Sequence, residues 1–294
     1  MPGIRLVIET DIHADVDDVG ALAVAHAHAD RGHAEILAIG INTPSRWGAY
    51  AAQAVNDFYG RSGIAIGVLY PQDDSVWRRD YARTLAARFE PTMVEPLAPA
   101  AQVLRRALDT SEPNSVTVVS LGFHHNLVAL IDQPGGRDAI ERAVGRTVVM
   151  GGAFPHGAEF NMIEHPAYAR RFVAEWPAGI DFVGFEVGET VITGAGIAWP
   201  NAADNPVAVA YEAFNGPGKG RPSWDLVTMD YAVRGEDGCY AVSQPGRVHL
   251  DERGRTRWVA DPGGPHRHVR STVADDELAC RLNVLLEAAP RSRG

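Results

Sequence analysis

Five acidic side chains fall within ten residues near the start of the sequence, at Glu9, Asp11, Asp15, Asp17 and Asp18. They follow an apolar run, Ile4–Ile8, that is typical of a buried strand, and the last two of them open a helical pattern. The helix dipole stabilises carboxylates in a first helical turn, but five together repel one another and favour a compensating cation. Hard divalent cations bind through such oxygens. We therefore predict a metal site at the carboxyl end of the first strand.

Helix capping and two familiar acidic motifs compete with metal binding as interpretations of this stretch. A single aspartate after a strand is commonly a helix cap, so the prediction rests on the whole cluster. An EF-hand loop counted from Asp11 would need an acidic residue, a glycine and a glutamate where the sequence has His13, Val16 and Leu22. A phosphatase of the aspartyl-nucleophile type would need an aspartate two residues before Asp11, but Glu9 stands there. Neither alternative fits.

The composition predicts a soluble globular protein. Of 294 residues, 46% are hydrophobic and 22% charged, and the net charge of −10 argues against nucleic acid or an anionic membrane as partner. Two cysteines, Cys239 and Cys280, make no disulfide framework. No signal peptide is visible, and no run approaches the roughly 18 apolar residues of a membrane span. A cytoplasmic location is expected.

Apolar runs alternate with helical patterns as far as residue 185. Strands are predicted at Ile4–Ile8, Glu35–Asn42, Ile64–Leu69, Ser115–Leu121, Arg146–Met150 and Ile180–Phe185. Helices are predicted from Asp17 to about Arg31 and at Trp47–Tyr59, Val76–Phe89, Ala98–Asp109, Asn126–Ile131 and Pro166–Glu175. This alternation predicts an α/β fold, with a mostly parallel central sheet and helices on both faces.

The last hundred residues have a different pattern. They predict helices at Asn205–Phe214, Ser223–Val233 (capped by Ser223) and Asp275–Glu287, a hairpin of Arg247–Leu250 with Thr256–Val259, and a frayed tail at Arg291–Gly294. The basic cluster His266–Arg270 is expected to be solvated surface. No repeat or linker is visible, so residues 1–294 are predicted to form a single domain.

Polar or glycine-rich loops follow four of the predicted strands. They begin at Asp11, Asn42, Gly122–Asn126 and Gly151–Asn161. Ligands of such folds bind outside the carboxyl ends of parallel strands. We therefore expect an active site where these four loops meet.

Four segments, in order, resemble the nucleoside hydrolase family, the inosine–uridine-preferring group and its relatives. Thr10–Asp18 is similar to the longer form of its acidic signature, and Gly40–Thr43 to its strand-two asparagine segment. Val149–Gly152 followed by Ala158–Asn161 resembles its MGG and EFN segments. Arg221–Asp225 resembles its late acidic motif, HD in some branches and WD in others.

The resemblance implies Ca2+-dependent hydrolysis of the N-glycosidic bond of a ribonucleoside or an analogue, giving ribose and free base. It implies a Ca2+ ion held by Asp11, Asp18, Asp225 and the main-chain carbonyl of His125, and a general base at Asp17. It further implies ribose contacts from Asn42, Glu159 and Asn161. Relatives form homodimers or homotetramers.

The leaving-group end is less clear from the sequence. Trp224 replaces an imidazole found in some branches and is a candidate to stack on the base. His13, His124 and His156 lie in loops expected to face the site, as candidate general acids. Each has the alternative of simple packing or surface exposure.

The departures from the family pattern suggest a non-standard substrate or lost activity. Glu9 stands where the family usually has aspartate, His13–Ala14 replaces a glycine-containing turn, and His124–His125 replaces a common Leu-Thr pair. A non-catalytic or diverged metal-dependent ribosyl-binding protein therefore remains the alternative. A Mg2+-dependent phosphotransferase would need phosphate-cradling glycine loops or arginine clamps, and the sequence shows neither.

Overall fold

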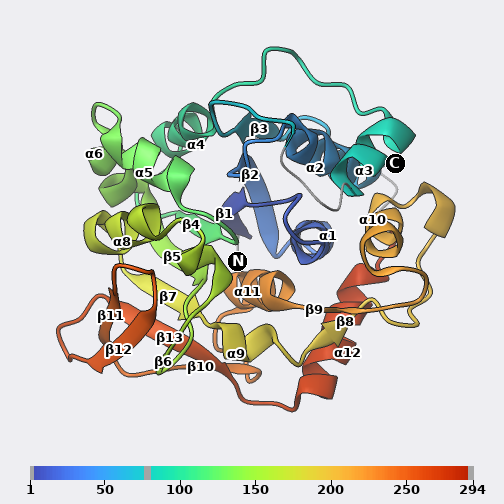
Figure 1. Cartoon of the computed structure of the whole chain (residues 1–294). Coiled ribbons are helices and arrows are strands. Elements are labelled where there is room, and N and C mark those ends of the chain that lie inside the picture. Colours follow the sequence, from blue (N-terminus) through green and yellow to red (C-terminus); the bar gives the residue numbers. More distant parts are fainter. Residues whose placement is uncertain (1–2, 76–80, 291–294) are drawn as a thin grey trace.

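The computed structural model of the protein describes residues 3–75 and 81–290. One large sheet organises the fold (Figure 1). Its parallel part consists, in spatial order, of β3 (Ala65–Val68), β2 (Ala34–Ile41), β1 (Ile4–Thr10), β4 (Val116–Ser120), β5 (Val144–Met150), β7 (Ile180–Val183) and β13 (His266–Ser271). The predicted mostly parallel α/β architecture is therefore confirmed.

The remaining strands are antiparallel and short. Beyond β13 the sheet continues through β11 (Gly246–Leu250), β12 (Thr256–Ala260) and β6 (His156–Gly157), while β10 (Tyr240–Val242) also pairs with β13. The predicted hairpin is the β11–β12 pair. A separate two-stranded ribbon joins β8 (Ile192–Thr193) to β9 (Arg221–Pro222).

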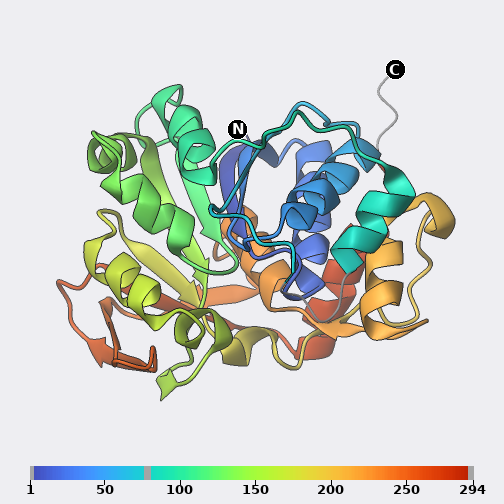
Figure 2. The ribbon, with the colours of Figure 1, turned by 45° about the horizontal axis from the view of Figure 1, so that its top comes forward.

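Helices cover both faces of the sheet, as Figures 1 and 2 show. One group comprises α1 (Asp17–Asp30), α2 (Arg46–Phe58), α3 (Tyr81–Phe89), α10 (Pro206–Asn215), α11 (Trp224–Arg234) and α12 (Asp275–Leu286). The opposite group, largely green in Figure 2, comprises α4 (Ala100–Asp109), α5 (His125–Asp132), α6 (Gly136–Ala143) and α8 (Pro166–Glu175). Two single-turn helices, α7 (Phe160–Ile163) and α9 (Phe185–Gly188), and a 3-10 turn at Ala202–Asp204 lie in the connections.

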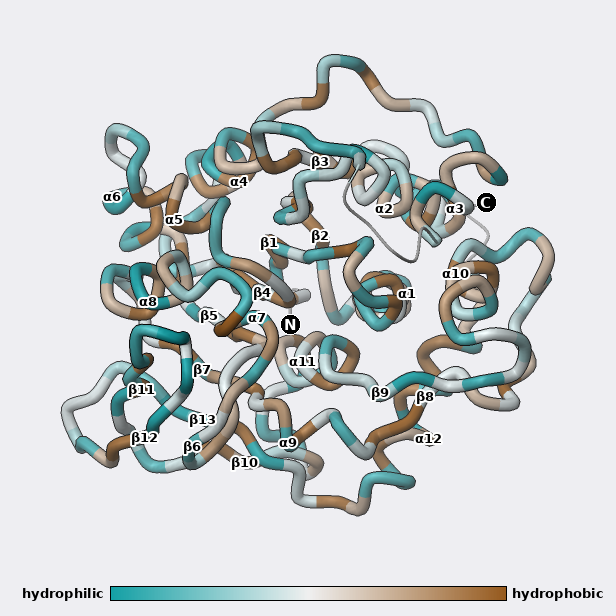
Figure 3. The backbone as a smooth tube through the Cα atoms, viewed as in Figure 1, coloured by the Kyte–Doolittle hydropathy of each residue, from teal (hydrophilic) through white to brown (hydrophobic). Residues whose placement is uncertain are grey.

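The alternation of side chains along β1 explains the two layers. Leu6 and Ile8 belong to the hydrophobic cluster under the α1 group, whereas Val7 belongs to the cluster under the α4 group. Successive side chains of a strand point to opposite faces, so a continuous apolar run buries both faces. Hydrophilic segments, teal in Figure 3, predominate around β11 and β12.

Several sequence-based predictions need correction. The helix α6 was not predicted. Ser223 precedes α11 but makes no side-chain capping bond; its hydroxyl contacts Thr193 Oγ1 at 2.7 Å and donates to the Arg221 carbonyl at 3.1 Å. Residues 76–80 of the predicted helix Val76–Phe89, and the tail at 291–294, lie outside the described residues.

The basic cluster is a strand of the central sheet, so its assignment as solvated surface was wrong for His266, although Arg267 and Arg270 are exposed as predicted. His266–Ser271 forms β13 and pairs in parallel with β7. His266 is buried, and its Nδ1 accepts a hydrogen bond of 3.0 Å from the Val248 amide. Val269 is buried as well, while Arg267 and Arg270 are exposed. The strand was missed because Val269 is the one apolar residue among the six of β13, so the segment contains no apolar run.

Among the helices of residues 3–75 and 81–290, none is long and apolar enough to cross a membrane.

The helices α1 and α11 pack side by side, and their N-terminal turns meet at the carboxyl edge of the sheet (Figure 1). Gly20 of α1 makes the close approach possible. A Cβ atom there would lie 2.7 Å from Leu226 Cδ1 and 2.5 Å from the Tyr211 hydroxyl. This contact therefore fixes how the first turn of α1 faces the first turn of α11.

Replacement of Leu226 by alanine tests this contact. Leu226 is fully buried, so Leu226→Ala should leave a cavity and lower the free energy of unfolding by about 2–5 kcal/mol. The measurement is urea unfolding followed by circular dichroism. Val284→Ala, on a side chain that is 55% exposed, is the control and should change stability by less than about 0.5 kcal/mol. Equal effects of the two variants would contradict the described packing.

Candidate metal and ribose site

Three aspartates from distant parts of the chain come together at the carboxyl edge of the sheet. Asp11 directly follows β1, Asp18 lies in the first turn of α1, and Asp225 lies in the first turn of α11. One carboxylate oxygen of each lies within 4.8 Å of the others, and all three side chains are buried. This places the three predicted carboxylate ligands around one position.

The arrangement suits a hard divalent cation. Thr10 Oγ1 donates to Asp18 Oδ1, while Asp18 Oδ2 is buried and has no hydrogen-bond partner among the residues that the structure describes. A buried carboxylate oxygen without a partner is costly, and a bound cation would remove that cost. The all-oxygen donor set is the kind that Ca2+ and Mg2+ prefer. The residues therefore fit a metal ion, and Asp11, Asp18 and Asp225 would hold it.

The protein alone does not balance the negative charge of these groups. Desolvation, with the neighbouring Asp15 and Glu159 carboxylates, raises the pKa of Asp11 to about 8. Burial and the surrounding aspartates likewise raise the pKa values of Asp18 and Asp225 well above the ordinary range. Without a cation, the site therefore favours protonated carboxyl groups.

Asp17, the predicted general base, lies beside this triad. Its Oδ2 accepts a 3.1 Å hydrogen bond from the Asp225 amide. Burial and the negative charge of Asp15 raise its pKa well above the usual value. Asp17 also lines the pocket described next, so its carboxylate can reach a ligand held near the triad.

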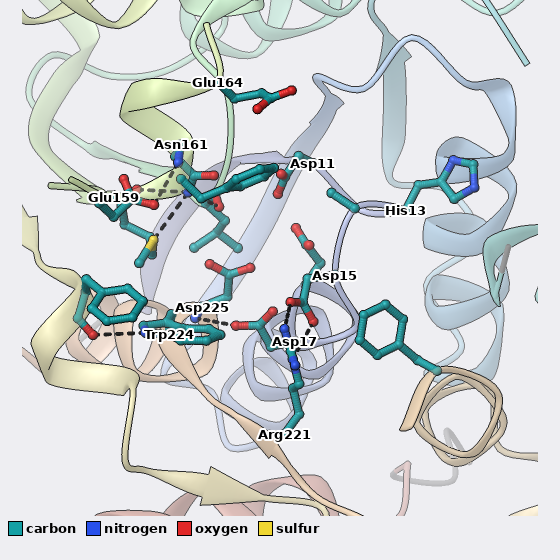
Figure 4. Close-up of a pocket in the computed structure, with 17 residues that line it drawn as sticks. Asp11, His13, Asp15, Asp17, Glu159, Asn161, Glu164, Arg221, Trp224 and Asp225 are labelled. Carbon is teal, nitrogen blue, oxygen red and sulfur yellow. Dashed lines mark hydrogen bonds and ion pairs between the residues drawn. The ribbon is translucent and has the colours of Figure 1, made fainter. Parts of the chain in front are cut away.

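A pocket of about 690 Å³ opens over the aspartates (Figure 4). It is lined by Asp11, His13, Ala14, Asp15, Asp17, Asp18, Leu121, Met150, Glu159, Phe160, Asn161, Glu164, Phe185, Phe214, Arg221, Trp224 and Asp225. Its volume is within the usual range for small-molecule sites. The predicted meeting of the loops after β1 and β5 at this edge agrees with that lining.

Glu159 and Asn161 form one end of the pocket. Glu159 caps α7 and accepts hydrogen bonds from the amides of Asn161 at 2.7 Å and Gly152 at 3.0 Å. The Asn161 Nδ2 donates to the Leu121 carbonyl at 3.0 Å. Burial raises the pKa of Glu159 to about 7. The two side chains are thus fixed by the backbone of the loops that follow β4 and β5.

Asn42, predicted to contact ribose, does not line the pocket. It is fully buried, and both ends of its amide are used within the protein. Its Nδ2 donates to Glu9 Oε2 at 3.2 Å, and its Oδ1 accepts from the Phe123 amide at 3.1 Å. The structure therefore places Asn42 beneath the site, where it joins the loop after β2 to the loop after β4.

Glu9, which stands where the family that the sequence resembles usually has aspartate, is at the centre of this buried network. Asn126 Nδ2 donates to Glu9 Oε2 at 3.1 Å and to the Ile41 carbonyl at 3.0 Å. A Cβ atom on Gly40 would lie 1.7 Å from Glu9 Oε1. Because Gly40 has no side chain, the longer glutamate fits.

The predicted histidines are placed differently from one another. The ring of His124 is buried against Phe172, with centroids 4.5 Å apart, and burial lowers its pKa to about 3. His124 does not line the pocket, and neither does His156, which is exposed in β6. The structure therefore places both imidazoles outside the residues that line the pocket, and the general-acid role expected for one of them stays a prediction. Hydrophobic packing against α8 decides the orientation of His124.

His125 is the first residue of α5, after the loop that follows β4, and His13 lies in the loop that follows β1. The ring of His125 packs against Tyr168, with centroids 4.0 Å apart, and does not line the pocket. The metal contact predicted for its main-chain carbonyl stays a prediction. His13 lines the pocket, and its amide donates to the Tyr81 hydroxyl at 2.7 Å. Its φ of 113° lies in a region that glycine adopts easily. The chain thus keeps the backbone shape of a glycine-containing turn without the glycine.

Trp224 lines the pocket as predicted for a base-stacking residue. Its ring stacks on Phe185, with centroids 5.4 Å apart, and its Nε1 donates to the Phe185 carbonyl at 2.9 Å. These contacts fix the indole plane beside Asp225.

Sequence reasoning missed Arg221 as a pocket residue, although the segment containing it had been singled out. Arg221 forms an ion pair with Asp15, 206 positions earlier in the chain. Asp15 had been left without a role among the five acids of the first segment. The signal in the sequence was Asp15 itself, because an acidic residue without a role beside the predicted metal ligands calls for a basic partner from another segment of the chain.

Comparison with solved structures identifies the fold. The inosine-uridine preferring nucleoside hydrolase of Bacillus anthracis superimposes with a TM-score of 0.71 at 18% identity, over 96% of this chain and 99% of that one. A plant nucleoside hydrolase gives 0.70 at 19% identity over 100% of both chains. The type III effector XopQ, complexed with adenosine diphosphate ribose, gives 0.72 at 16% identity over 98% of this chain and 95% of that one.

The protein therefore has the nucleoside hydrolase fold, and the resemblance noted in its sequence is confirmed at the level of structure. No family model and no curated protein matches the sequence.

The raised pKa values predict how the stability of the metal-free protein depends on pH. Asp11 and Glu9 titrate near pH 8 in the folded state but near pH 4 when unfolded. Between about pH 6.5 and 8 the folded protein therefore holds more protons than the unfolded chain. Its free energy of unfolding should fall as pH rises, by up to about 1.4 kcal/mol per pH unit for each group. Below about pH 6.5, buried histidines such as His124 act in the opposite direction.

Thermal unfolding of chelator-treated protein at pH 6.5 and 8 measures this effect. The melting temperature should fall with pH, and added Ca2+ should raise it more at pH 8, because the cation binds ionised carboxylates. Asp18→Asn should reduce the Ca2+ effect. A metal-free melting temperature that rises over this range would contradict the raised pKa values, and no response to Ca2+ would contradict binding of that cation at the triad.

Proposed function

We propose that the protein is a Ca2+-dependent N-ribohydrolase that converts a ribonucleoside or a close analogue to ribose and free base. The observation that carries this proposal is the buried triad of Asp11, Asp18 and Asp225 beside Asp17, in a pocket with Glu159 and Asn161 at one end. Seven lining residues are carboxylic, and such a surface suits the hydroxyl groups and developing positive charge of a sugar.

Each side chain has a defined task in this proposal. Asp11, Asp18 and Asp225 would hold Ca2+, together with the main-chain carbonyl of His125 and ribose hydroxyls. When bound, the ion would make the attacking water more acidic and help to position it. Asp17 takes the proton of the attacking water, and Glu159 and Asn161 bind ribose hydroxyls. The surrounding carboxylates stabilise the oxocarbenium-like sugar as the C1′–N bond breaks.

The proposal extends to the context of the enzyme. We place it in the cytoplasm as a homodimer or homotetramer with a small-molecule substrate and no nucleic-acid or membrane partner. The net charge of −10 argues against a nucleic-acid or anionic-membrane partner, and the absence of a long apolar run in the sequence argues against a membrane span. The proposed oligomeric state follows the family that the sequence resembles. Light scattering of the purified protein gives the oligomeric state.

Asp17→Asn tests the assignment of the base. The amide can still accept the hydrogen bond from the Asp225 backbone but takes up no proton, so ribose release should fall about 100- to 10,000-fold. The measurement is reducing sugar released from a panel of purine and pyrimidine nucleosides. Asp109→Asn, on a surface ion pair of α4 with a side chain 48% exposed, is the matched control.

Chelation provides the second arm of this experiment. Activity should vanish with chelator and return with Ca2+. Full activity in Asp17→Asn would exclude Asp17 as the base.

A second candidate function is calcium-dependent binding of a riboside without turnover. It is supported by two features, the absence of His124 and His156 from the pocket lining and the likeness to an effector solved with adenosine diphosphate ribose. Calorimetric titration with adenosine diphosphate ribose in Ca2+, together with the nucleoside panel, separates the two functions. Efficient ribose release excludes the binding-only function.

A further inference from the structure

Arg221 enters the pocket from β9 at the end opposite Glu159 and Asn161 (Figure 4). Its Nε donates to Asp15 Oδ1 at 2.9 Å, and its Nη2 donates to Asp15 Oδ2. Such a bidentate pair holds the guanidinium plane in one orientation. The Nη1 group has no acceptor within residues 3–75 and 81–290, so its two N–H groups are available to a ligand.

Aromatic rings frame this guanidinium. Its carbon lies 5.3 Å from the centroid of the Phe214 ring and 5.6 Å from that of Trp224. Trp224 is in turn fixed by its stack on Phe185. Flat aromatic surfaces and a planar cation favour a flat heterocycle, whereas the carboxylates around Asp17 favour a sugar. The base of a nucleoside therefore belongs at the Arg221 end.

The pocket offers few other donors for a departing base. His13 is the one imidazole among the lining residues, and the other titratable lining groups besides Arg221 are carboxylic. In the labelled view, the His13 ring points away from Asp11 and Asp15 (Figure 4). The proposed Ca2+ ligands and the proposed base, Asp17, cannot also donate a proton to the leaving base. Of the other lining carboxyl groups, Asp15 is paired with Arg221, and Glu159 and Glu164 lie away from Arg221 (Figure 4).

We infer that Arg221 binds the leaving base and stabilises the negative charge that it acquires, with Asp15 as the positioning residue. This inference rests on the proposed hydrolysis. As water oxygen bonds to C1′, the electron pair of the C1′–N bond passes to the base nitrogen, and the water proton goes to Asp17. Arg221 keeps its protons and donates hydrogen bonds from Nη1 to acceptor atoms of the base. The base anion is then protonated by solvent.

The substrate class follows from this arrangement. Two N–H donors on Nη1 match heterocycles with a carbonyl oxygen or a pyridine-type nitrogen on the edge facing the pocket mouth. A leaving group whose anion is stable by itself should depend less on Arg221, because its own structure already delocalises the negative charge. Sensitivity to loss of Arg221 should therefore depend on the leaving group.

The experiment compares two substrates that share the ribose. Arg221→Gln is assayed with inosine and with p-nitrophenyl β-riboside, whose leaving group departs as a stable anion. The loss of kcat/KM should be about 10- to 100-fold greater for inosine, as expected for a lost hydrogen bond from a charged donor. Arg221→Lys should recover part of the loss, Asp15→Asn should show a weaker form of the same pattern, and guanidinium ion should partly restore Arg221→Ala.

Controls keep the result specific. Arg171→Gln removes a bidentate surface pair with Asp132, remote from the pocket, and should affect neither substrate. Equal losses on both substrates in Arg221→Gln, or no loss, would overturn the assignment. If the wild-type protein cleaves neither substrate, the proposed hydrolysis fails by itself. Calorimetric titration with hypoxanthine then decides the binding role, because Arg221→Gln should weaken binding about tenfold and an unchanged Kd would overturn it.

Discussion

Repulsion between buried carboxyl groups is the constraint around which this end of the molecule is built. Asp11, Asp17, Asp18 and Asp225 are all nearly inaccessible to solvent, yet they lie side by side. Ordinary folding avoids such an arrangement, because every ionised group raises the cost of its neighbours. The sheet imposes it by ending β1 at this edge, and the packing of α1 on α11 brings two helix N-termini to the same point. The dipoles of both helices favour the negative charge there.

The parallel half of the fold could be predicted because each strand is an apolar run that ends in a polar loop. Burial on both faces makes β1, β2, β4 and β5 recognisable without knowledge of their partners. The later strands lack this signal. His266 and Val269 are buried in β13, but arginines stand between and after them, and pairing with β7 makes this segment a strand. Pairing with a strand far away in the chain cannot be predicted from the residues of one segment alone.

The site shows the same division between local and distant information. The composition of the acidic segment by itself predicts a bound cation. The resemblance of four ordered segments to a known family pointed to Asp225 as the distant partner. The orientation of single side chains was not predictable. His124 turns to Phe172, Asn42 is enclosed by Glu9 and Phe123, and Asp15 meets Arg221. Each outcome depends on a neighbour from another element.

The distance along the chain between the candidate metal ligands has a consequence for biosynthesis. Asp11 and Asp18 leave the ribosome early, but Asp225 follows about two hundred residues later, and closing so long a loop is entropically unfavourable until the sheet between them exists. A growing chain therefore holds an acidic cluster that cannot yet bind a cation tightly. A cation held by all three aspartates would therefore bind tightly only after nearly the whole sheet has assembled, and it would stabilise finished molecules over partly folded ones.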